Sequence, residues 1–239
     1  MPADPPPVHV IGMGDDGPAG LGAEARALLA HADLVCGGHR HLGLLSGGAK
    51  AGARLMPITA DLDGLVAAIE NARQEGGCAV VLASGDPLFF GIGEALGRRL
   101  GREALHVLPA PSSVQLAFAR IGLSWQDAEV LSAHGRPLGR ILGRAMAATK
   151  MAVLTDETNT PAAVARALLN GGMEDARAAV GEHLGGPRER VTRGVLSEIA
   201  GREFARLNVL IVEREPAMVR WGRPLVGQPE SAYAHARAA

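Results

Sequence analysis

Short apolar runs alternate with longer amphipathic stretches along the first half of the chain. The run at residues 78–83, CAVVLA, is apolar at every position, which is typical of a strand buried on both faces of a parallel sheet. Residues 61–75 carry apolar side chains three and four positions apart, which predicts a helix with one buried face. The same alternation predicts strands at residues 8–11, 34–36 and 105–108 and helices at residues 22–32 and 89–100. This β–α–β succession indicates an α/β fold with a mainly parallel sheet.

The segment Pro109-Ala110-Pro111 is the best candidate for a hinge, so we expect two domains, at residues 1–110 and 111–239. Directly after it, Ser112 and Gln115 fit a capping box, in which each side chain bonds a free backbone N–H at a helix N-terminus. Thr160-Pro161 is typical of a helix start, and Gly171-Gly172 of its end. The pattern also predicts a helix at residues 137–148 and strands at residues 129–132, 151–155, 178–181 and 207–213. The Pro-rich start and the Ala/Arg-rich residues 232–239 are expected to be tails.

Composition narrows the class of protein. Apolar residues make up 47% and charged residues 21% of the 239 positions, which is typical of a soluble globular chain. The formal net charge is -1 and aromatic residues make up 3%, so a nucleic-acid-binding surface is not expected. No apolar run is long enough to cross a bilayer, and the two cysteines lie in apolar segments, as suits a reducing compartment. We therefore expect a cytoplasmic protein that binds neither nucleic acid nor membrane.

The sequence Gly12-Met13-Gly14-Asp15-Asp16-Gly17 matches the glycine pattern of dinucleotide-binding loops and follows a predicted strand. Two features argue against a dinucleotide there. Asp15 and Asp16 stand where a pyrophosphate needs bare backbone amides, and no acidic residue ends the second predicted strand. An NAD-binding oxidoreductase stays open as an alternative, but a loop with carboxylates better suits a cationic or neutral ligand.

The strand at residues 78–83 runs into Ser84-Gly85-Asp86-Pro87, at the sheet edge where open α/β sheets bind ligands. Gly85 allows close approach to the backbone, and Asp86 suits a cation. Alternatively, Asp86 only caps the next helix. The apolar, glycine-containing run at residues 89–93 favours a loop that contacts a ligand, and Ser112 and Ser113 follow another strand that ends at the same edge.

Two further groups of polar residues have more than one interpretation. Cys36, His39 and His41 suggest a metal, but no fourth ligand is suitably spaced, so no metal site is expected. Arg136, Arg140 and Arg144 are spaced for one helix face, with Lys150 beyond them and no acid between residues 131 and 150. They form either an ordinary solvated face or a site for a small polyanion such as a polycarboxylate.

Seven segments, taken in order, form a recognisable series: VHVIGMG (8–14), SGDP (84–87), SSVQLA (112–117), SAHGR (132–136), LTDETNTP (154–161), GEHLGG (181–186) and LNV (207–209). They resemble those of the tetrapyrrole (precorrin) methylases, over residues 8 to about 228. The similarity is greatest to the subgroup that methylates C5, which comprises the N-terminal half of precorrin-6Y C5,15-methyltransferases and the stand-alone (cobalt-)precorrin-7 C5-methyltransferases.

The resemblance implies two α/β domains, the second with a mixed sheet, an active site in the cleft between them, and a homodimer. It implies transfer of a methyl group from S-adenosylmethionine to C5 of a late precorrin in cobalamin biosynthesis. Methylation of another macrocycle carbon is the alternative within the family. The sulfonium of the cofactor is already activated, so no catalytic nucleophile is needed, and we assign no catalytic residue and no metal.

The resemblance also implies which residues bind the two reactants. The substrate, a tetrapyrrole, would be bound by His134, Arg136 and Arg140. The expected contacts of the cofactor are Gly85, Asp86, Phe89, Ser112, Ser113, Thr155, Leu184, Asn208 and Val209.

The chain departs from the family in its first glycine loop, where Asp15 and Asp16 follow Gly14, so we expect no cofactor contact there. Enzymes with both activities continue into a second methyltransferase domain that acts at C15 and decarboxylates. The chain is therefore expected to be either a stand-alone form or a piece that precedes such a domain, which would otherwise be a separate partner.

Overall fold

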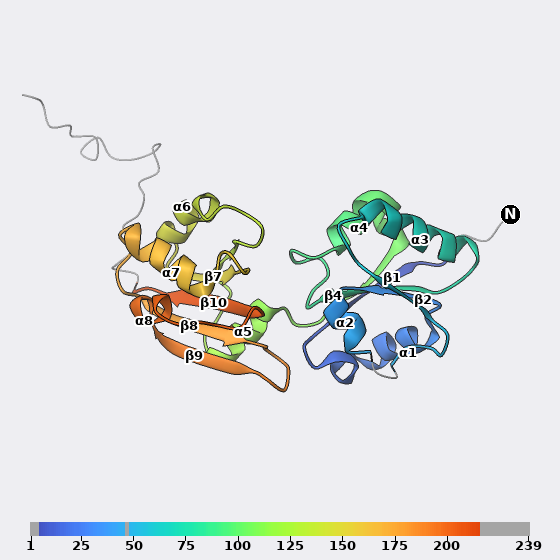
Figure 1. The fold of residues 1–239 in the computed structure, drawn as a ribbon, viewed down its shortest axis with the longest axis horizontal. Helices are drawn as coiled ribbons and strands as arrows, with labels where there is room; N and C mark the ends of the chain where they lie inside the picture. The colour runs from blue at the N-terminus through green and yellow to red at the C-terminus, as the bar shows by residue number, and fades with distance from the viewer. Residues whose placement is uncertain (1–4, 46–47, 216–239) are drawn as a thin grey trace, which may run out of the picture. The chain divides into compact units, whose positions relative to one another are not determined.

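The computed structural model describes residues 5–45 and 48–215, so the tail expected at residues 232–239 lies outside the described part. The chain forms two compact units (Figure 1). Unit 1 comprises Met1–Leu116 and His183–Glu189, and unit 2 comprises Ala117–Glu182 and Arg190–Ala239. Each unit is built around a five-stranded sheet.

The sheet of unit 1 is parallel throughout, as the alternation of strands and helices predicts. Its strand order is β3-β2-β4-β1-β5, and every neighbouring pair runs parallel. The central strands β1 and β4 are almost wholly buried, which explains their continuous apolar sequences. The strands are β1 (Val8–Met13), β2 (Leu34–Gly37), β3 (Arg54–Pro57), β4 (Ala79–Ser84) and β5 (Leu105–Leu108).

Helices cover both faces of this sheet (Figure 1). The helices α1 (Ala23–His31) and α2 (His39–Gly43) lie on one face, and α3 (Leu62–Gln74) and α4 (Gly93–Leu100) lie on the other. A hydrophobic core fills the space on each side. Short 3-10 turns follow β1 (η1, Gly17–Gly20) and precede β5 (η2, Arg102–Ala104).

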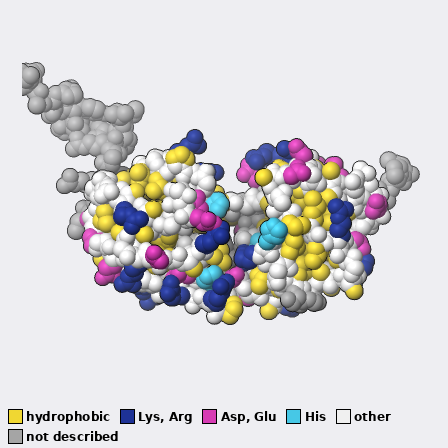
Figure 2. Space-filling view, viewed as in Figure 1, with side chains coloured by type: hydrophobic (Ala, Val, Ile, Leu, Met, Phe, Trp, Pro, Cys, Tyr) yellow, Lys and Arg dark blue, Asp and Glu magenta, His cyan; other side chains and the backbone are white. Residues whose placement is uncertain are grey.

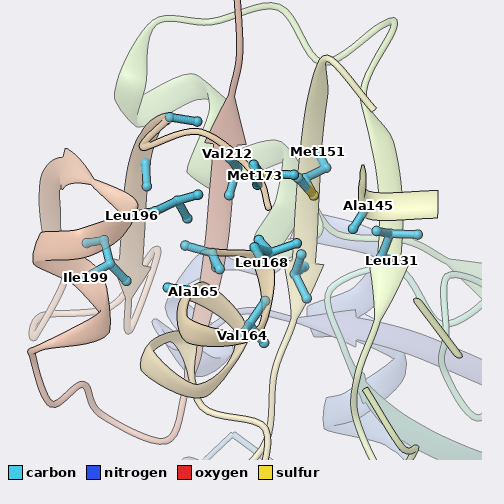
Figure 3. Packing of buried hydrophobic residues seen from close by; sticks show 14 of the residues in the cluster. Leu131, Ala145, Met151, Val164, Ala165, Leu168, Met173, Leu196, Ile199 and Val212 are labelled. Atoms are coloured by element: carbon cyan, nitrogen blue, oxygen red, sulfur yellow. The ribbon is translucent and has the colours of Figure 1, made fainter. Parts of the chain in front are cut away.

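The sheet of unit 2 is mixed, with strand order β6-β7-β10-β8-β9. Only the β6–β7 pair is parallel, and the other three pairs are antiparallel. Leu168 of α7 and Leu196 of α8 pack against Met151 and Val212 of the sheet (Figure 3). The strands are β6 (Glu129–Ser132), β7 (Lys150–Leu154), β8 (Arg177–Glu182), β9 (Arg190–Val195) and β10 (Asn208–Glu213), and the helices are α6 (Gly139–Ala147), α7 (Pro161–Asn170) and α8 (Leu196–Ala200).

The helix α5 (Ser113–Ile121) begins in unit 1 and ends in unit 2. None of the described helices is long and apolar enough to cross a membrane. Acidic and basic side chains are interspersed over the visible face of the described residues, consistent with the net charge of -1 (Figure 2).

Two sequence-based predictions of elements need correction. The helix expected from residue 89 begins only at Gly93, because the backbone N–H of Gly93 bonds the Pro87 carbonyl and Phe90 has a left-handed φ of 53°. Residues 89–92 are therefore a loop. The edge strands β3 and β9 and the short helices α2 and α8 were not predicted, since these two strands have no fully buried position and mix polar with apolar residues.

A pair of histidines joins β1 to β5. His9 and His106 lie opposite each other in the strand register, with their Nδ1 atoms 3.0 Å apart, and Glu24 Oε1 is 3.5 Å from His106 Nε2. Burial, helped by His106 and opposed by Glu24, lowers the pKa of His9 below its usual 6.5. Folding therefore favours the neutral form of His9.

This pair makes stability depend on pH. A histidine with a lowered folded-state pKa contributes stability that is present above pH 6.5 and is lost as the pH falls through the folded-state pKa. We expect the free energy of unfolding, measured in urea, to fall between pH 7 and pH 5 less steeply in His9→Gln than in the wild type. The exposed His39, replaced by Gln, serves as control and should keep the wild-type slope. Equal slopes in His9→Gln and the wild type would contradict this prediction.

Candidate functional site

Close backbone packing holds the loops at the carboxyl end of the parallel sheet. The chain leaves β4 through Gly85, whose φ is +58°, and the Gly85 N–H bonds the Met13 carbonyl at 3.3 Å. The Gly85 carbonyl accepts a bond from the Ala110 N–H at 3.2 Å. A Cβ at Gly12 would collide with the Gly85 carbonyl oxygen. The loops after β4 and β5 are therefore fixed against the end of β1, and only glycine fits at positions 12 and 85.

Asp86 lies in this loop with its carboxylate bonded to backbone only. Asp86 Oδ1 accepts a hydrogen bond from the Leu88 N–H at 2.9 Å. The alternative that Asp86 caps the next helix is wrong, since α4 begins at Gly93 with Ile92 as its cap residue. In the part of the chain that the structure describes, no cation pairs with Asp86. The rings of Phe89 and Phe90 pack edge to face, with their centroids 4.9 Å apart.

The capping box predicted at the start of α5 is confirmed. The Ser112 N–H donates to Gln115 Oε1 at 2.8 Å, and the Gln115 N–H donates to Ser112 Oγ at 3.2 Å. Ser112 is buried, and its Cα would lie 3.0 Å from a Cβ at Gly85. Six of the residues expected to contact the cofactor thus belong to unit 1: Gly85, Asp86, Phe89, Ser112, Ser113 and Leu184.

The other three expected cofactor residues meet at one end of the sheet of unit 2. The Thr155 hydroxyl donates to Asn208 Oδ1 at 2.6 Å, and Asn208 Nδ2 donates to the Ala205 carbonyl at 2.7 Å. Val209 pairs with Leu154 in the sheet and is 1% exposed. Its side chain therefore belongs to the core, which leaves only its backbone available to a ligand.

Asp156 and Asn159 tie the His134–Arg136 turn to the loop after β7. Asp156 accepts hydrogen bonds from the N–H groups of Asn159 (2.6 Å) and Gly135 (2.7 Å), which lower the pKa of this carboxyl. Asn159 Nδ2 donates to the carbonyls of Ala133 and Arg136, at 2.7 and 2.9 Å. The sequence motifs contain Asp156 and Asn159, but no role was predicted for either.

Of the four basic side chains between residues 136 and 150, only two have no acidic partner among the described residues. Arg144 Nε donates to Glu129 at 2.7 Å, and Lys150 Nζ lies 2.6 Å from Asp127, so acids that precede the basic run neutralise both. Arg136 lies in the turn before α6, so it does not share a helix face with Arg140 as predicted. Among the described acids none pairs with Arg136 or Arg140, and both side chains are exposed.

A polar cluster that the sequence did not reveal lies at the same edge of the unit 1 sheet. Arg40 NH1 donates to Asp15 Oδ1 at 2.9 Å, and Arg40 NH2 donates to Ser84 Oγ at 3.0 Å. Burial lowers the pKa of His41 to about 4, so this side chain is neutral near pH 7. Arg40 therefore neutralises Asp15, so this carboxylate gives the first glycine loop no preference for a cationic over a neutral ligand. No described group of residues could hold a metal ion.

The first glycine loop is poorly shaped for a dinucleotide. Its third glycine, Gly17, opens a 3-10 turn, whereas a pyrophosphate site needs the start of an α-helix. The Asp16 carboxylate lies over the loop, where Asp16 Oδ1 is 2.6 Å from the position of a Cβ at Gly14. The geometry therefore does not favour the NAD alternative.

A parallel sheet with glycine-bearing loops at its carboxyl end, followed in the chain by a mixed sheet, defines an α/β protein of two units. The family model of the tetrapyrrole (corrin/porphyrin) methylases matches residues 7–200, and the chain belongs to this family. The family and the fold class expected from the sequence are thereby confirmed.

Two known relatives match most of the chain. The chain is 40% identical over 210 residues to precorrin-6Y C(5,15)-methyltransferase [decarboxylating] of Sinorhizobium sp., covering 87% of this chain and 49% of that protein. It is 34% identical over 182 residues to cobalt-precorrin-7 C(5)-methyltransferase of Salmonella typhimurium, covering 76% and 87%. The chain spans about half the length of the precorrin-6Y relatives it matches.

Among solved structures, the uroporphyrin-III C-methyltransferase of Thermus thermophilus complexed with S-adenosylhomocysteine has a TM-score of 0.67. Its sequence is 22% identical, and the match covers 87% of this chain and 97% of that one. This likeness shows the shared fold.

Proposed function

We propose that this chain is an S-adenosylmethionine-dependent methyltransferase that methylates C5 of a late precorrin, of the precorrin-7 or precorrin-6 type, in cobalamin biosynthesis. Two relatives support this. The Sinorhizobium protein is named for methylation at C5 and C15, and the match covers 49% of its length; the Salmonella protein is named for C5 alone, and the match covers 87% of its length. Methylation at C5 is the activity that the two names share.

The observation that carries the proposal is the Asp86 carboxylate in the loop after β4. Asp86 accepts a hydrogen bond from Leu88 and has no cation partner among the described residues. Asp15, which follows β1 of the same sheet, is instead neutralised by Arg40. S-adenosylmethionine, when bound, supplies an activated methyl group on a positively charged sulfur. A free carboxylate in a glycine loop fits such a cation better than it fits a pyrophosphate.

The chain's own residues would bind and align the two reactants. Gly85, Asp86 and Phe89, with Ser112, Ser113 and Leu184 of unit 1 and Thr155, Asn208 and Val209 of unit 2, would hold the cofactor. Alignment of the reactants and exclusion of water lower a reaction barrier by up to about 7–11 kcal/mol in favourable cases. Because the methyl group is already activated, we propose that these two effects supply the catalysis, and we assign no general acid or base.

The basic groups of unit 2 would bind the substrate. Late precorrins carry acetate and propionate side chains, and Arg136 and Arg140 are exposed cations without an acidic partner among the described residues. The bonds from Asn159 to the Ala133 and Arg136 carbonyls fix the turn that carries His134 and Arg136. A preorganised turn loses less conformational freedom when the substrate binds.

We further propose that the protein works in the cytoplasm as a homodimer, as the family resemblance implies. Methylation at C15 would belong to a further domain or to a separate partner. The support for this division is that the match covers about half of the precorrin-6Y relatives and most of the Salmonella relative.

The reaction itself is the first test. Incubation with methyl-labelled S-adenosylmethionine and a late precorrin should give one added methyl group, located at C5 by mass spectrometry and NMR. A methyl group at another carbon would support the alternative within the family. Thermal stabilisation by NAD but not by S-adenosylmethionine would refute the proposal.

Asp86→Asn should discriminate between the charged cofactor and its neutral product. Loss of the carboxylate should weaken S-adenosylmethionine about fivefold, as expected for a partly exposed ion pair, and should weaken S-adenosylhomocysteine less. Isothermal titration calorimetry measures both, with Glu70→Gln on the exposed side of α3 as control. An equal effect on the two ligands would show that Asp86 does not sense the sulfur charge.

Arg136→Ala should weaken a corrin polycarboxylate about tenfold without changing cofactor affinity, because a charge-assisted hydrogen bond to a carboxylate is removed. Arg144→Ala is the matched control, since Arg144 is already paired with Glu129. Fluorescence titration measures the corrin and calorimetry the cofactor. Equal losses for both ligands would place Arg136 outside the substrate site.

A further inference from the structure

Arg40 is held at the carboxyl end of the unit 1 sheet by groups that follow three different strands. Arg40 itself lies in α2, directly after β2, while Asp15 follows β1 and Ser84 ends β4. Its guanidinium is 2.9 Å from Asp15, 3.0 Å from Ser84 Oγ and 2.9 Å from His41 Nε2. These contacts fix the orientation of the guanidinium plane.

The fixed guanidinium still has hydrogen-bonding capacity. Arg carries five N–H donors and no acceptor. The contacts described engage NH1 once, with Asp15, and NH2 twice, with Ser84 and His41, so Nε and one hydrogen of NH1 have no partner within residues 5–45 and 48–215. The Arg40 side chain is 34% exposed, whereas that of Asp15 is 8% exposed. A ligand can therefore reach Arg40 while Asp15 stays largely covered.

His41 adds a second, independent sign that the cluster is not purely structural. Since Arg40 can only donate, His41 Nε2 must accept, and the ring hydrogen of this neutral imidazole then lies on Nδ1. Nδ1 is buried and is without a hydrogen-bond partner among the described residues. Buried polar groups in native structures are nearly always paired, and exceptions call for an explanation.

Further basic groups lie next to the cluster. His183 Nδ1 is 3.4 Å from the second Asp15 oxygen, and Arg188 NH2 is 3.5 Å from the same His183 nitrogen. Asp15 offsets the charge of Arg40, and Arg188 brings a second arginine close to the cluster. A guanidinium held in a fixed plane, with N–H donors to spare, suits a carboxylate.

We propose that Arg40 binds a carboxylate of a reactant and that Asp15, His41 and Ser84 position its guanidinium. The inference rests on the proposed function, because both reactants of that methyl transfer carry carboxylates: the amino-acid end of the cofactor, and the acetate and propionate groups of the corrin. Ser84, which Arg40 contacts, immediately precedes Gly85 and Asp86, so the Arg40 guanidinium lies beside the proposed cofactor loop.

Paired ligands with and without carboxylates identify the source. S-adenosylhomocysteine is compared with 5′-methylthioadenosine, which lacks the amino-acid end, and cobyrinic acid with its heptamethyl ester. Affinities for the full chain are measured by calorimetry in the wild type, Arg40→Gln, Arg40→Lys and the control Arg98→Gln, whose arginine pairs with Glu94 on the surface of α4. Urea unfolding of each variant reports its stability.

Arg40→Gln should weaken one of the two acids about 10- to 100-fold and leave its carboxylate-free counterpart within about twofold. Loss confined to S-adenosylhomocysteine assigns the cofactor carboxylate, and loss confined to cobyrinic acid assigns the substrate. Arg40→Lys, which keeps the charge without the fork, should lose less and carries the test if Arg40→Gln does not fold.

Unchanged affinities, or equal losses for an acid and its counterpart, would show a purely structural ion pair and overturn the inference. These outcomes differ from failure of the proposed function. If the wild type transfers methyl groups but Arg40 variants lose no carboxylate-dependent affinity, only the inference fails. If the wild type binds neither thioether and transfers no methyl group, the proposed function fails as well.

Discussion

The arrangement of the unit 1 loops depends on one close contact between two stretches of backbone. Gly12 in β1 and Gly85 after β4 approach so closely that a side chain at either position would meet backbone atoms of the other loop or of Ser112. The hydrogen bonds that link Gly85 to Met13 and Ala110 depend on this approach. A larger residue at position 12 would push the β4 loop, and with it Asp86, away from the end of β1.

Both units contain paired and unpaired charged side chains near the candidate site. Most ionised groups near the candidate site are already paired, as in Asp15 with Arg40 and Arg144 with Glu129. Asp86, Arg136 and Arg140 have no such partner among the described residues. Since the net charge is only -1, we propose that charged ligands are bound by these unpaired groups and not by a field of the whole chain.

The sequence predicted the central elements well, because their periodicity reflects burial. The wholly apolar β4 and the amphipathic α3 follow the predicted pattern, and the Ser112–Gln115 capping box is local chemistry that four residues encode. The edge strands β5 and β6 were predicted, but the edge strands β3 and β9 were not. No position of β3 or β9 is fully buried, and β9 mixes Arg and Thr with Val, so neither strand has a clear apolar pattern.

The site features that could not be predicted from the sequence depend on contacts between residues far apart in the chain. Nothing in the sequence near Arg40 indicates that Asp15, which is 25 residues away, and Ser84, which is 44 residues away, would meet it. The basic run around Arg144 contains no acid, so its neutralisation by Glu129, 15 residues earlier, was equally hidden. The motif residues predicted from the family resemblance are placed in two groups, one in each unit, and their roles stay predictions.

The short segment His183–Glu189 means that the two units are not separable pieces of chain. It belongs to unit 1, where Gly186 lies against Asp15, although β8 and β9 on either side of it belong to unit 2. Glu182 and Arg190 flank this segment. The Arg190 guanidinium donates two hydrogen bonds to the Glu182 carboxylate, at 2.6 and 2.8 Å, which join the two ends of the segment. A fragment that ends at residue 116 would lack this segment. Gene fusion can therefore transfer the two units together, but it cannot transfer unit 1 alone as one continuous stretch of chain.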